Sequence, residues 1–275
     1  MNVLYCGDSR GYAGMEASIY SLLTYTKNIN IYVFSMTYER DEGDGLMRVF
    51  LGITEEQKKK LRKIVNYLDY KGSSITFIDT LDYYNTYFLN GVNENDGHSS
   101  PYAPLRLIVD IVLPYVPHIL YLDCDTIIQE DLNPMYQYYL DKINTSEHSY
   151  AAFSNRFTDS EGKTFGHDMV AGVLLFDLNK CKQSKLLEKA RYNITHNYYQ
   201  WYDQSALQEA GKYVELPQTY NYMKKYEYRD YEPAILHFSD ELNPKVYFEP
   251  DAFYKKYPHL QYIKDGIKLL DTINF

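Results

Sequence analysis

Short apolar runs typical of β-strands alternate with helical patterns through the first half of the chain. Strands are expected at residues 3–6, 31–35 and 75–78, and helical patterns separate them at residues 15–25 and 54–67. This alternation predicts βαβ units and a mainly parallel, Rossmann-like sheet. Ligands of such sheets bind beyond the carboxyl ends of the strands, so residues that carry chemistry are sought there.

The second half continues without a Gly/Ser-rich linker. Further strands are expected at residues 118–122, 172–176 and 234–238, and one helix over residues 180–196. The chain has 275 residues, of which 45% are hydrophobic and 24% charged, and this is enough for one large core. We therefore expect a single α/β domain.

The helix expected at residues 54–67 carries its own start signal. Thr54 and Gln57 have the spacing of a capping box. Glu55 and Glu56 come before a run of basic residues, an order that suits the helix dipole. The basic run is therefore explained as a solvated helix face that needs no anionic partner.

Charge and cysteine content exclude several classes of protein. The 37 acidic and 28 basic residues give a net charge of −9, which opposes binding to phosphate backbones, so no nucleic-acid partner is expected. Three widely spaced cysteines cannot form a disulfide framework. The first residues lack the pattern of a signal peptide, and charges and prolines interrupt the most apolar region, residues 105–122. We expect a cytoplasmic protein without a transmembrane segment.

Two carboxylates, Asp123 and Asp125, directly follow the apolar run at residues 118–122. Alternation along a strand would point both to the same side. Neighbouring carboxylates repel each other, and a divalent cation such as Mg²⁺, Ca²⁺ or Mn²⁺ relieves that repulsion. Because turns and helix caps contain the same spacing, the pair alone leaves a metal site and a structural role open.

The same segment also fits the Asp-x-Asp-x-Thr start of haloacid-dehalogenase-type phosphatases, in which the first Asp is the nucleophile. Those enzymes complete their metal site with a later acidic motif, Gly-Asp or Asp-Asp. Neither pair occurs after Asp125. The phosphatase interpretation is therefore disfavoured.

Six segments, in chain order, resemble the motifs of family 8 retaining glycosyltransferases. They are residues 3–8 (VLYCGD), 98–106 (HSSPYAPLR), 121–125 (YLDCD), 171–178 (AGVLLFDL), 202–207 (YDQSAL) and 235–245 (ILHFSDELNPK). The resemblance covers nearly the full length. It implies a single GT-A domain with a mixed, Rossmann-like sheet flanked by helices. In that domain, residues 1–125 would form the nucleotide-binding half and residues 126–275 the sugar and acceptor half.

The resemblance also implies roles for individual residues. Asp123, Asp125 and His237 would bind Mn²⁺, with Mg²⁺ as the alternative ion. Asp203 would hold sugar hydroxyls and Gln204 would lie near the anomeric carbon, so these two are the expected catalytic residues. The donor pocket would be formed by Cys6, Gly7, Asp8, Ser9, Tyr12, Ser99, Arg106, Asp123, Cys124, Ala171, Gly172 and Lys245. Within it, Asp8 would contact the uracil and Arg106 the diphosphate or sugar oxygens.

Three positions depart from the family pattern. Val170 stands where the family has Asn, and Asp240 stands where it has Gly. Asn243 occupies the position of the closing Lys, and Lys245 comes two residues later. These departures leave the identity of the hexose open. They also motivate one alternative, a catalytically inactive module on the same fold that binds nucleotide sugars or glycans.

The expected activity is metal-dependent transfer of a hexose, galactose or glucose, from a UDP-sugar donor with α-linkage. The acceptor would be a glycan or glycoprotein, as in bacterial surface glycan biosynthesis. From Lys245 onward, five lysines face four acidic residues, so no basic tail indicates a membrane anchor.

Overall fold

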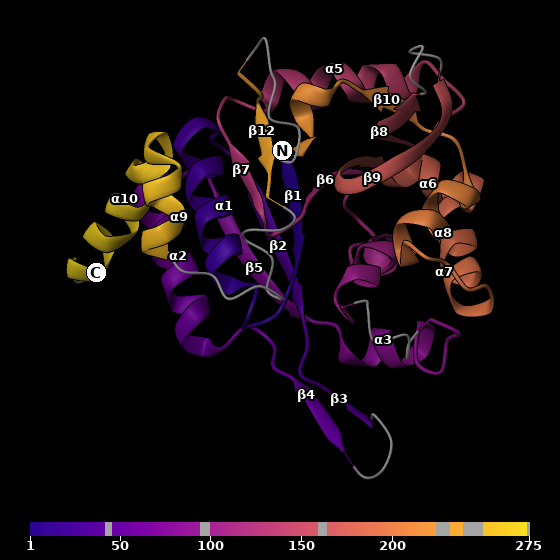
Figure 1. Cartoon of the computed structure of the whole chain (residues 1–275), viewed down its shortest axis with the longest axis horizontal. Helices are drawn as coiled ribbons and strands as arrows, with labels where there is room; N and C mark the ends of the chain where they lie inside the picture. The colour runs from indigo at the N-terminus through magenta and orange to yellow at the C-terminus, as the bar shows by residue number, and fades with distance from the viewer. Residues whose placement is uncertain (42–45, 94–99, 159–163, 224–231, 239–249, 274–275) are drawn as a thin grey trace.

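A computed structural model describes residues 1–41, 46–93, 100–158, 164–223, 232–238 and 250–273 (Figure 1). Its centre is a seven-stranded sheet with the strand order β10-β8-β9-β6-β1-β2-β5. The strands of this sheet are β1 (Asn2–Cys6), β2 (Asn30–Ser35), β5 (Ser74–Asp79), β6 (His118–Leu122), β8 (Tyr150–Thr158), β9 (Thr164–Asp177) and β10 (Val214–Leu216). All seven lie in one continuous layer, which supports a single-domain fold.

The sheet is mixed, with both parallel and antiparallel strand pairs. Strands β6, β1, β2 and β5 run parallel to one another, as the βαβ pattern predicts. Strand β9 runs antiparallel to both β6 and β8. Four of the six strand pairs, including that of β10 with β8, are parallel, which confirms the prediction of a mainly parallel sheet. Strand β9, which follows β8 directly in the order of elements, is the antiparallel exception.

Helices cover both faces of the sheet. Side chains alternate along β1, so that Val3 and Tyr5 enter one buried cluster and Leu4 and Cys6 enter the other. The first cluster is covered by α1 (Tyr12–Tyr25), α2 (Glu55–Asp69), α5 (Asn133–Asn144), α9 (Pro250–Lys256), η3 (Pro258–Leu260) and α10 (Gln261–Thr272). The second is covered by α3 (Leu81–Tyr87), η1 (Ala103–Ile108), α4 (Val109–Val112), α6 (Leu178–Ser184), α7 (Leu186–His196) and α8 (Tyr202–Ala210).

Two smaller sheets complete the fold. Strands β3 (Tyr38–Asp41) and β4 (Met47–Phe50) form an antiparallel pair that extends away from the body of the molecule (Figure 1). Strand β12 (Ile235–His237) lies between β7 (Thr126–Ile128) and β11 (Tyr222–Met223). The short η2 helix (Gln218–Tyr220) precedes β11. This three-stranded sheet places β12 next to β7, the strand that follows β6 in the chain.

Most of the expected elements are present, and one helix needs correction. The expected helix over residues 180–196 is two helices, α6 and α7, separated at Lys185, whose φ of 58° lies in the left-handed region. Lys185 is neither Gly nor Pro, so its sequence carries no signal for this break. Within the described residues, no helix is both long enough and apolar enough to cross a membrane.

The capping box at the start of α2 is confirmed. The Thr54 hydroxyl accepts a hydrogen bond from the Gln57 amide N–H at 3.2 Å, and the Gln57 side-chain oxygen accepts one from the Thr54 N–H at 2.9 Å. The sequence therefore locates the start of this helix correctly.

Candidate functional site

The segment that joins β6 to β7 carries the Asp-x-Asp pair. The Asp123 N–H donates to the carbonyl of Gly172 on β9 at 2.8 Å. The Asp125 carbonyl accepts a hydrogen bond from the N–H of Phe238, just after β12, also at 2.8 Å. Thr126 closes the turn by donating its hydroxyl to the Asp123 carbonyl at 2.8 Å. The pair is thus fixed between the large and the small sheet, in a turn rather than in the strand expected from alternation.

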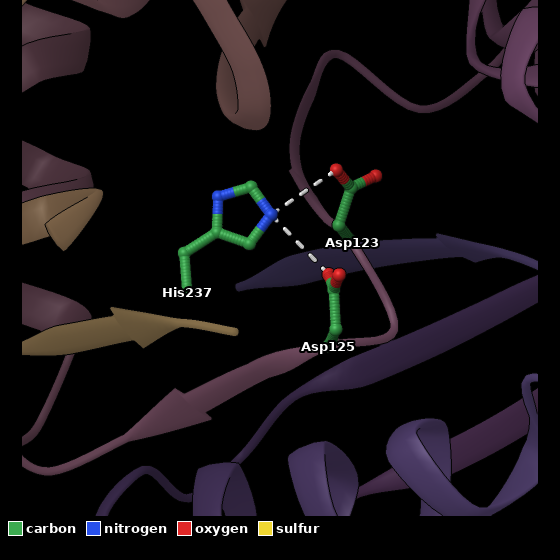
Figure 2. Close-up of side chains that lie close together, drawn as sticks. All are labelled: Asp123, Asp125 and His237. Carbon is green, nitrogen blue, oxygen red and sulfur yellow. Dashed lines mark ion pairs between the residues drawn. The ribbon is translucent and has the colours of Figure 1, made fainter. Parts of the chain in front are cut away.

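The carboxylates of this pair and the imidazole of His237 converge on one point (Figure 2). His237 Nε2 lies 3.3 Å from Asp125 Oδ1 and 3.6 Å from Asp123 Oδ2. One ligand atom from each residue lies within 4.8 Å of those from the other two. His237 is buried, whereas 27% of the Asp123 side chain is exposed. Two carboxylate oxygens and one imidazole nitrogen, open on one side, form a donor set that fits a divalent cation.

The charges of this cluster are strongly coupled. Burial lowers the pKa of His237, but the Asp125 carboxylate and its hydrogen bond outweigh burial, and the net effect raises the pKa above 6.5. Burial raises the pKa of Asp125, but His237 outweighs burial and the net pKa falls below 3.8. A cation at this point would therefore compete with a proton for the imidazole of His237.

Arg106, on η1, lies beside the same cluster. Its guanidinium is buried, with Nη1 3.4 Å from Asp123 Oδ1 and Nε 2.8 Å from Asp203 Oδ2. The guanidinium carbon lies 4.2 Å from the centre of the Tyr121 ring. The Tyr121 hydroxyl in turn donates a hydrogen bond to Asp123 Oδ1. These contacts join Asp203 to the Asp-x-Asp turn through one buried cation.

Asp203 lies in the first turn of α8, and one oxygen of its carboxylate accepts no hydrogen bond from the described residues. Although Arg106 Nε is close, its N–H points to the Ala103 carbonyl at 2.9 Å. Asp203 Oδ2 accordingly has no hydrogen-bond donor within the described part of the chain. Burial raises the pKa of Asp203 to about 6, despite the opposing charge of Arg106. A buried carboxylate oxygen without a donor is ready to accept a hydrogen bond from a hydroxyl of a ligand.

Gln204, the next residue, contacts the strand beneath the site. Its side-chain oxygen accepts a hydrogen bond from the Ala171 N–H at 3.1 Å. Arg106 Nη1 donates a hydrogen bond to the carbonyl of Ala171. Ala171 and Gly172 are thereby held against both Arg106 and the Asp-x-Asp turn. Two of the expected donor-pocket residues therefore lie directly beside the expected catalytic pair.

Comparison with known proteins identifies the family. The model of glycosyl transferase family 8 matches residues 2–244. The chain belongs to this family. The resemblance of the sequence motifs is thereby confirmed, and the protein is a glycosyltransferase. Among curated protein sequences, none matches the chain.

Solved structures of glycosyltransferases resemble the chain in fold. The galactosyltransferase LgtC, solved with donor and acceptor sugar analogs, has a TM-score of 0.66 and 17% identity, covering 100% of this chain and 98% of LgtC. GlyE of Streptococcus pneumoniae TIGR4 has a TM-score of 0.60 and 18% identity, covering 97% of this chain and 64% of GlyE. WbbM, described as bifunctional, has a TM-score of 0.65 and 14% identity, covering 88% of this chain and 46% of WbbM. This likeness shows the GT-A fold, as expected, and does not extend to substrates.

The expected nucleotide side of this family 8 protein lies at the carboxyl end of β1. Cys124 Sγ donates to the Cys6 carbonyl at 3.4 Å. A Cβ at Gly7 would lie 2.9 Å from Cys124 Sγ, so only glycine allows this approach without a shift. The structure therefore brings Cys6, Gly7 and Cys124 together next to the Asp-x-Asp turn.

Asp8 is already engaged in the turn that leads into α1. Its Oδ1 accepts hydrogen bonds from the N–H groups of Arg10 and Gly11 at 3.1 and 2.8 Å, and Oδ2 pairs with the Arg10 guanidinium at 2.9 Å. The Ser9 N–H donates a hydrogen bond to the Leu51 carbonyl. The Tyr12 hydroxyl donates to Glu16, within α1. Nucleotide contacts by Asp8, Ser9 and Tyr12 remain predictions.

Two expected donor contacts, Ser99 and Lys245, lie outside the described residues, as do Asp240 and Asn243. Two residues with clear contacts to the site were not expected from the sequence. Tyr121 lies in an apolar strand and has the pattern of a core residue. Asn221, which contacts His237 at 2.9 Å, follows no motif, so only the three-dimensional structure reveals it.

Proposed function

We propose that this glycosyltransferase transfers a hexose, galactose or glucose, from a UDP-hexose to a glycan or glycoprotein acceptor, with retention of the α configuration. One observation carries the proposal. The buried side chain of Arg106 contacts both Asp203 and Asp123, and so links Asp203 to the cluster of Asp123, Asp125 and His237. The cluster of Asp123, Asp125 and His237 suits a cation that binds a diphosphate, and Asp203 suits sugar hydroxyls.

Asp123, Asp125 and His237 would hold the cation, and the imidazole nitrogen favours Mn²⁺ over Mg²⁺. When bound, the cation would neutralise the charge that develops on the UDP leaving group. The nucleotide would lie against residues 1–125 and the sugar against β9 and α8 in residues 126–275. We place the reaction in the cytoplasm, where the three free cysteines would stay reduced.

The residues around the sugar limit the mechanism. Asp203 Oδ2 would accept a hydrogen bond from a sugar hydroxyl, and Arg106 would hold the carboxylate charge in place. The side-chain oxygen of Gln204 is occupied by the Ala171 N–H, and an amide is a poor nucleophile. We therefore favour attack by the acceptor hydroxyl on the face that UDP leaves, with a leaving phosphate oxygen accepting the acceptor's proton.

The test is release of UDP from UDP-galactose, UDP-glucose and other UDP-hexoses, measured with Mn²⁺ and with a chelator. The Asp125→Ala variant removes a central cation ligand, and Asp82→Ala, at an exposed position on α3, is the matched control. We expect one donor to be hydrolysed with Mn²⁺ by the wild type and by Asp82→Ala, but not by Asp125→Ala. Undiminished turnover in Asp125→Ala would contradict the site. Metal-dependent UDP binding without turnover, even with glycan acceptors, would favour the inactive binding module.

A further inference from the structure

Asn221 is completely buried between η2 and β11, and both ends of its side chain are engaged. Its Nδ2 donates to the Val170 carbonyl at 3.2 Å. Its Oδ1 lies 2.9 Å from His237 Nδ1. Because a carbonyl oxygen can only accept, the bond to Val170 fixes which end of the amide is nitrogen and leaves oxygen facing the imidazole.

This orientation determines the tautomer of the neutral imidazole. Asn221 Oδ1 can only accept, so His237 Nδ1 must carry the hydrogen of the shared bond. The lone pair of the neutral ring is then on Nε2, the atom that faces Asp125 at 3.3 Å and Asp123 at 3.6 Å. The opposite tautomer would place a hydrogen on Nε2, where a cation ligand is needed.

We propose that Asn221 is a positioning residue that holds His237 as an Nε2 ligand, an inference that rests on the proposed function of the cluster. A hydrogen-bond acceptor behind a ligating histidine fixes its ring orientation and tautomer and makes it a better ligand.

The rest of the local structure limits movement of the ring. A Cβ at Gly172 would lie 2.2 Å from His237 Cε1, so the imidazole lies directly against the backbone of β9. Met223 on β11 is the register partner of His237 on β12, which keeps the segment after Asn221 paired with the strand that carries the histidine. The ring is thus held between Asn221, the β9 backbone and the two carboxylates.

The experiment measures Mn²⁺ affinity by the electron paramagnetic resonance signal of free Mn²⁺, in the presence of UDP, with thermal unfolding of each metal-free variant alongside. Asn221→Leu removes the acceptor at similar size, whereas Asn221→Asp keeps an oxygen acceptor. Asn93→Leu is the control, because Asn93 is also buried but binds the end of α7 through Ile194 and Asn197.

We expect Asn221→Leu to bind Mn²⁺ about 10–100-fold more weakly than the wild type. Asn221→Asp keeps the acceptor but loses the donor to Val170, so it should bind Mn²⁺ more tightly than Asn221→Leu. Asn93→Leu should lose stability without losing affinity. Wild-type affinity in Asn221→Leu would overturn the inference. An equal loss in Asn93→Leu would overturn it too, since the loss would then not depend on the acceptor behind His237. If the wild type itself does not bind Mn²⁺, the proposed metal site fails together with this inference.

A second measurement does not depend on the variant folding. The ¹⁵N spectrum of histidine-labelled wild-type protein with Mg²⁺ and UDP reports which ring nitrogen carries the hydrogen, and the His237 signal is assigned by its loss in His237→Gln. We expect a protonated Nδ1. A protonated Nε2 with a bare Nδ1 would overturn the inference while leaving cation binding itself intact.

Discussion

Arg106 Nε lies 2.8 Å from Asp203 Oδ2, yet it donates its hydrogen to the Ala103 carbonyl. The guanidinium therefore compensates the charge of Asp203 without hydrogen bonding to that oxygen. The carboxylate keeps an unused acceptor inside the protein, at a cost that the raised pKa of Asp203 reflects. A buried ionisable group whose surroundings are unfavourable for folding is typical of a functional site.

The first prediction concerns the stability of Asp203→Asn. The folded protein raises the pKa of Asp203 from 3.8 to about 6, so the folded state binds this proton more tightly than the unfolded state. That stabilisation is complete below about pH 4 and is lost as the pH rises through about 6. At pH 7.5 the ionised carboxylate lowers the free energy of unfolding by up to about 3 kcal/mol.

Asparagine keeps the shape of Asp203 without the charge. We expect Asp203→Asn to raise the free energy of unfolding of the metal-free protein at pH 7.5, and to change it little at pH 4. Urea denaturation at both pH values measures the difference. Turnover should fall about 10–100-fold, because a charged acceptor is lost. A variant less stable than the wild type at pH 7.5 would show that Arg106 needs the charge of Asp203 more than burial opposes it.

The second prediction concerns the guanidinium of Arg106. Its separate nitrogens contact Ala103, Ala171 and the carboxylates of Asp123 and Asp203, and the single ammonium of lysine cannot reach all of these. Arg106→Lys should therefore lose about 1–3 kcal/mol of stability, because buried acceptors lose their donors, and it should lose its turnover as well. Arg156→Lys, at an exposed ion pair with Glu215, is the control and should be near neutral. Comparable stability of the two variants in urea denaturation would contradict the buried bridging role.

The third prediction concerns Gly172. A methyl group there would lie 2.2 Å from His237 Cε1, so Gly172→Ala must displace the imidazole or the strand. We expect Mn²⁺ affinity to fall at least about tenfold, the order of loss seen when the support of a metal ligand is disturbed. Gly91→Ala, whose new methyl group would come no closer than 3.1 Å to its neighbours, controls for the added side chain. Isothermal titration calorimetry measures the Mn²⁺ affinity of both variants. Equal affinities of Gly172→Ala and Gly91→Ala would rule out the tight packing of His237 on β9.

The fourth prediction tests local structure away from the site. Thr54→Ala removes the hydroxyl that caps α2 and should lower the free energy of unfolding by about 1 kcal/mol. Among the described residues, no hydrogen bond joins the Thr54 side chain to the proposed site, so turnover per folded molecule should not change. Thermal unfolding and a UDP-release assay on the same samples check both parts. A loss of turnover at full folding would mean that the start of α2 also shapes the nucleotide side.

Some features could be predicted from the sequence because they are local. The strands at β1, β2, β5 and β6 are short runs rich in apolar and β-branched residues, and the capping box of α2 lies within four residues. The approach of His237 to the Asp-x-Asp turn was anticipated only through the resemblance to family 8, because more than a hundred residues separate them. The antiparallel direction of β9 and the break at Lys185 depend on tertiary packing, for which the residues carry no local signal.

The supporting residues of the site were harder to predict. Tyr121 has the pattern of a core residue, and nothing in the sequence indicates that its hydroxyl reaches Asp123. Asn221 follows no motif, and its contact with His237 arises from the pairing of β11 with β12. Both residues act through other side chains, so their contribution becomes visible only when the contacts are known.

The most direct test of the account is the position of Mn²⁺ in a crystal of the protein grown with Mn²⁺ and UDP. An anomalous difference map above the manganese absorption edge locates the ion without assumptions about the site. We expect one strong peak bonded to Asp123, Asp125 and Nε2 of His237, with the diphosphate on the exposed side of Asp123. Bound UDP with no peak among these three residues, or with the ion held elsewhere, would contradict it.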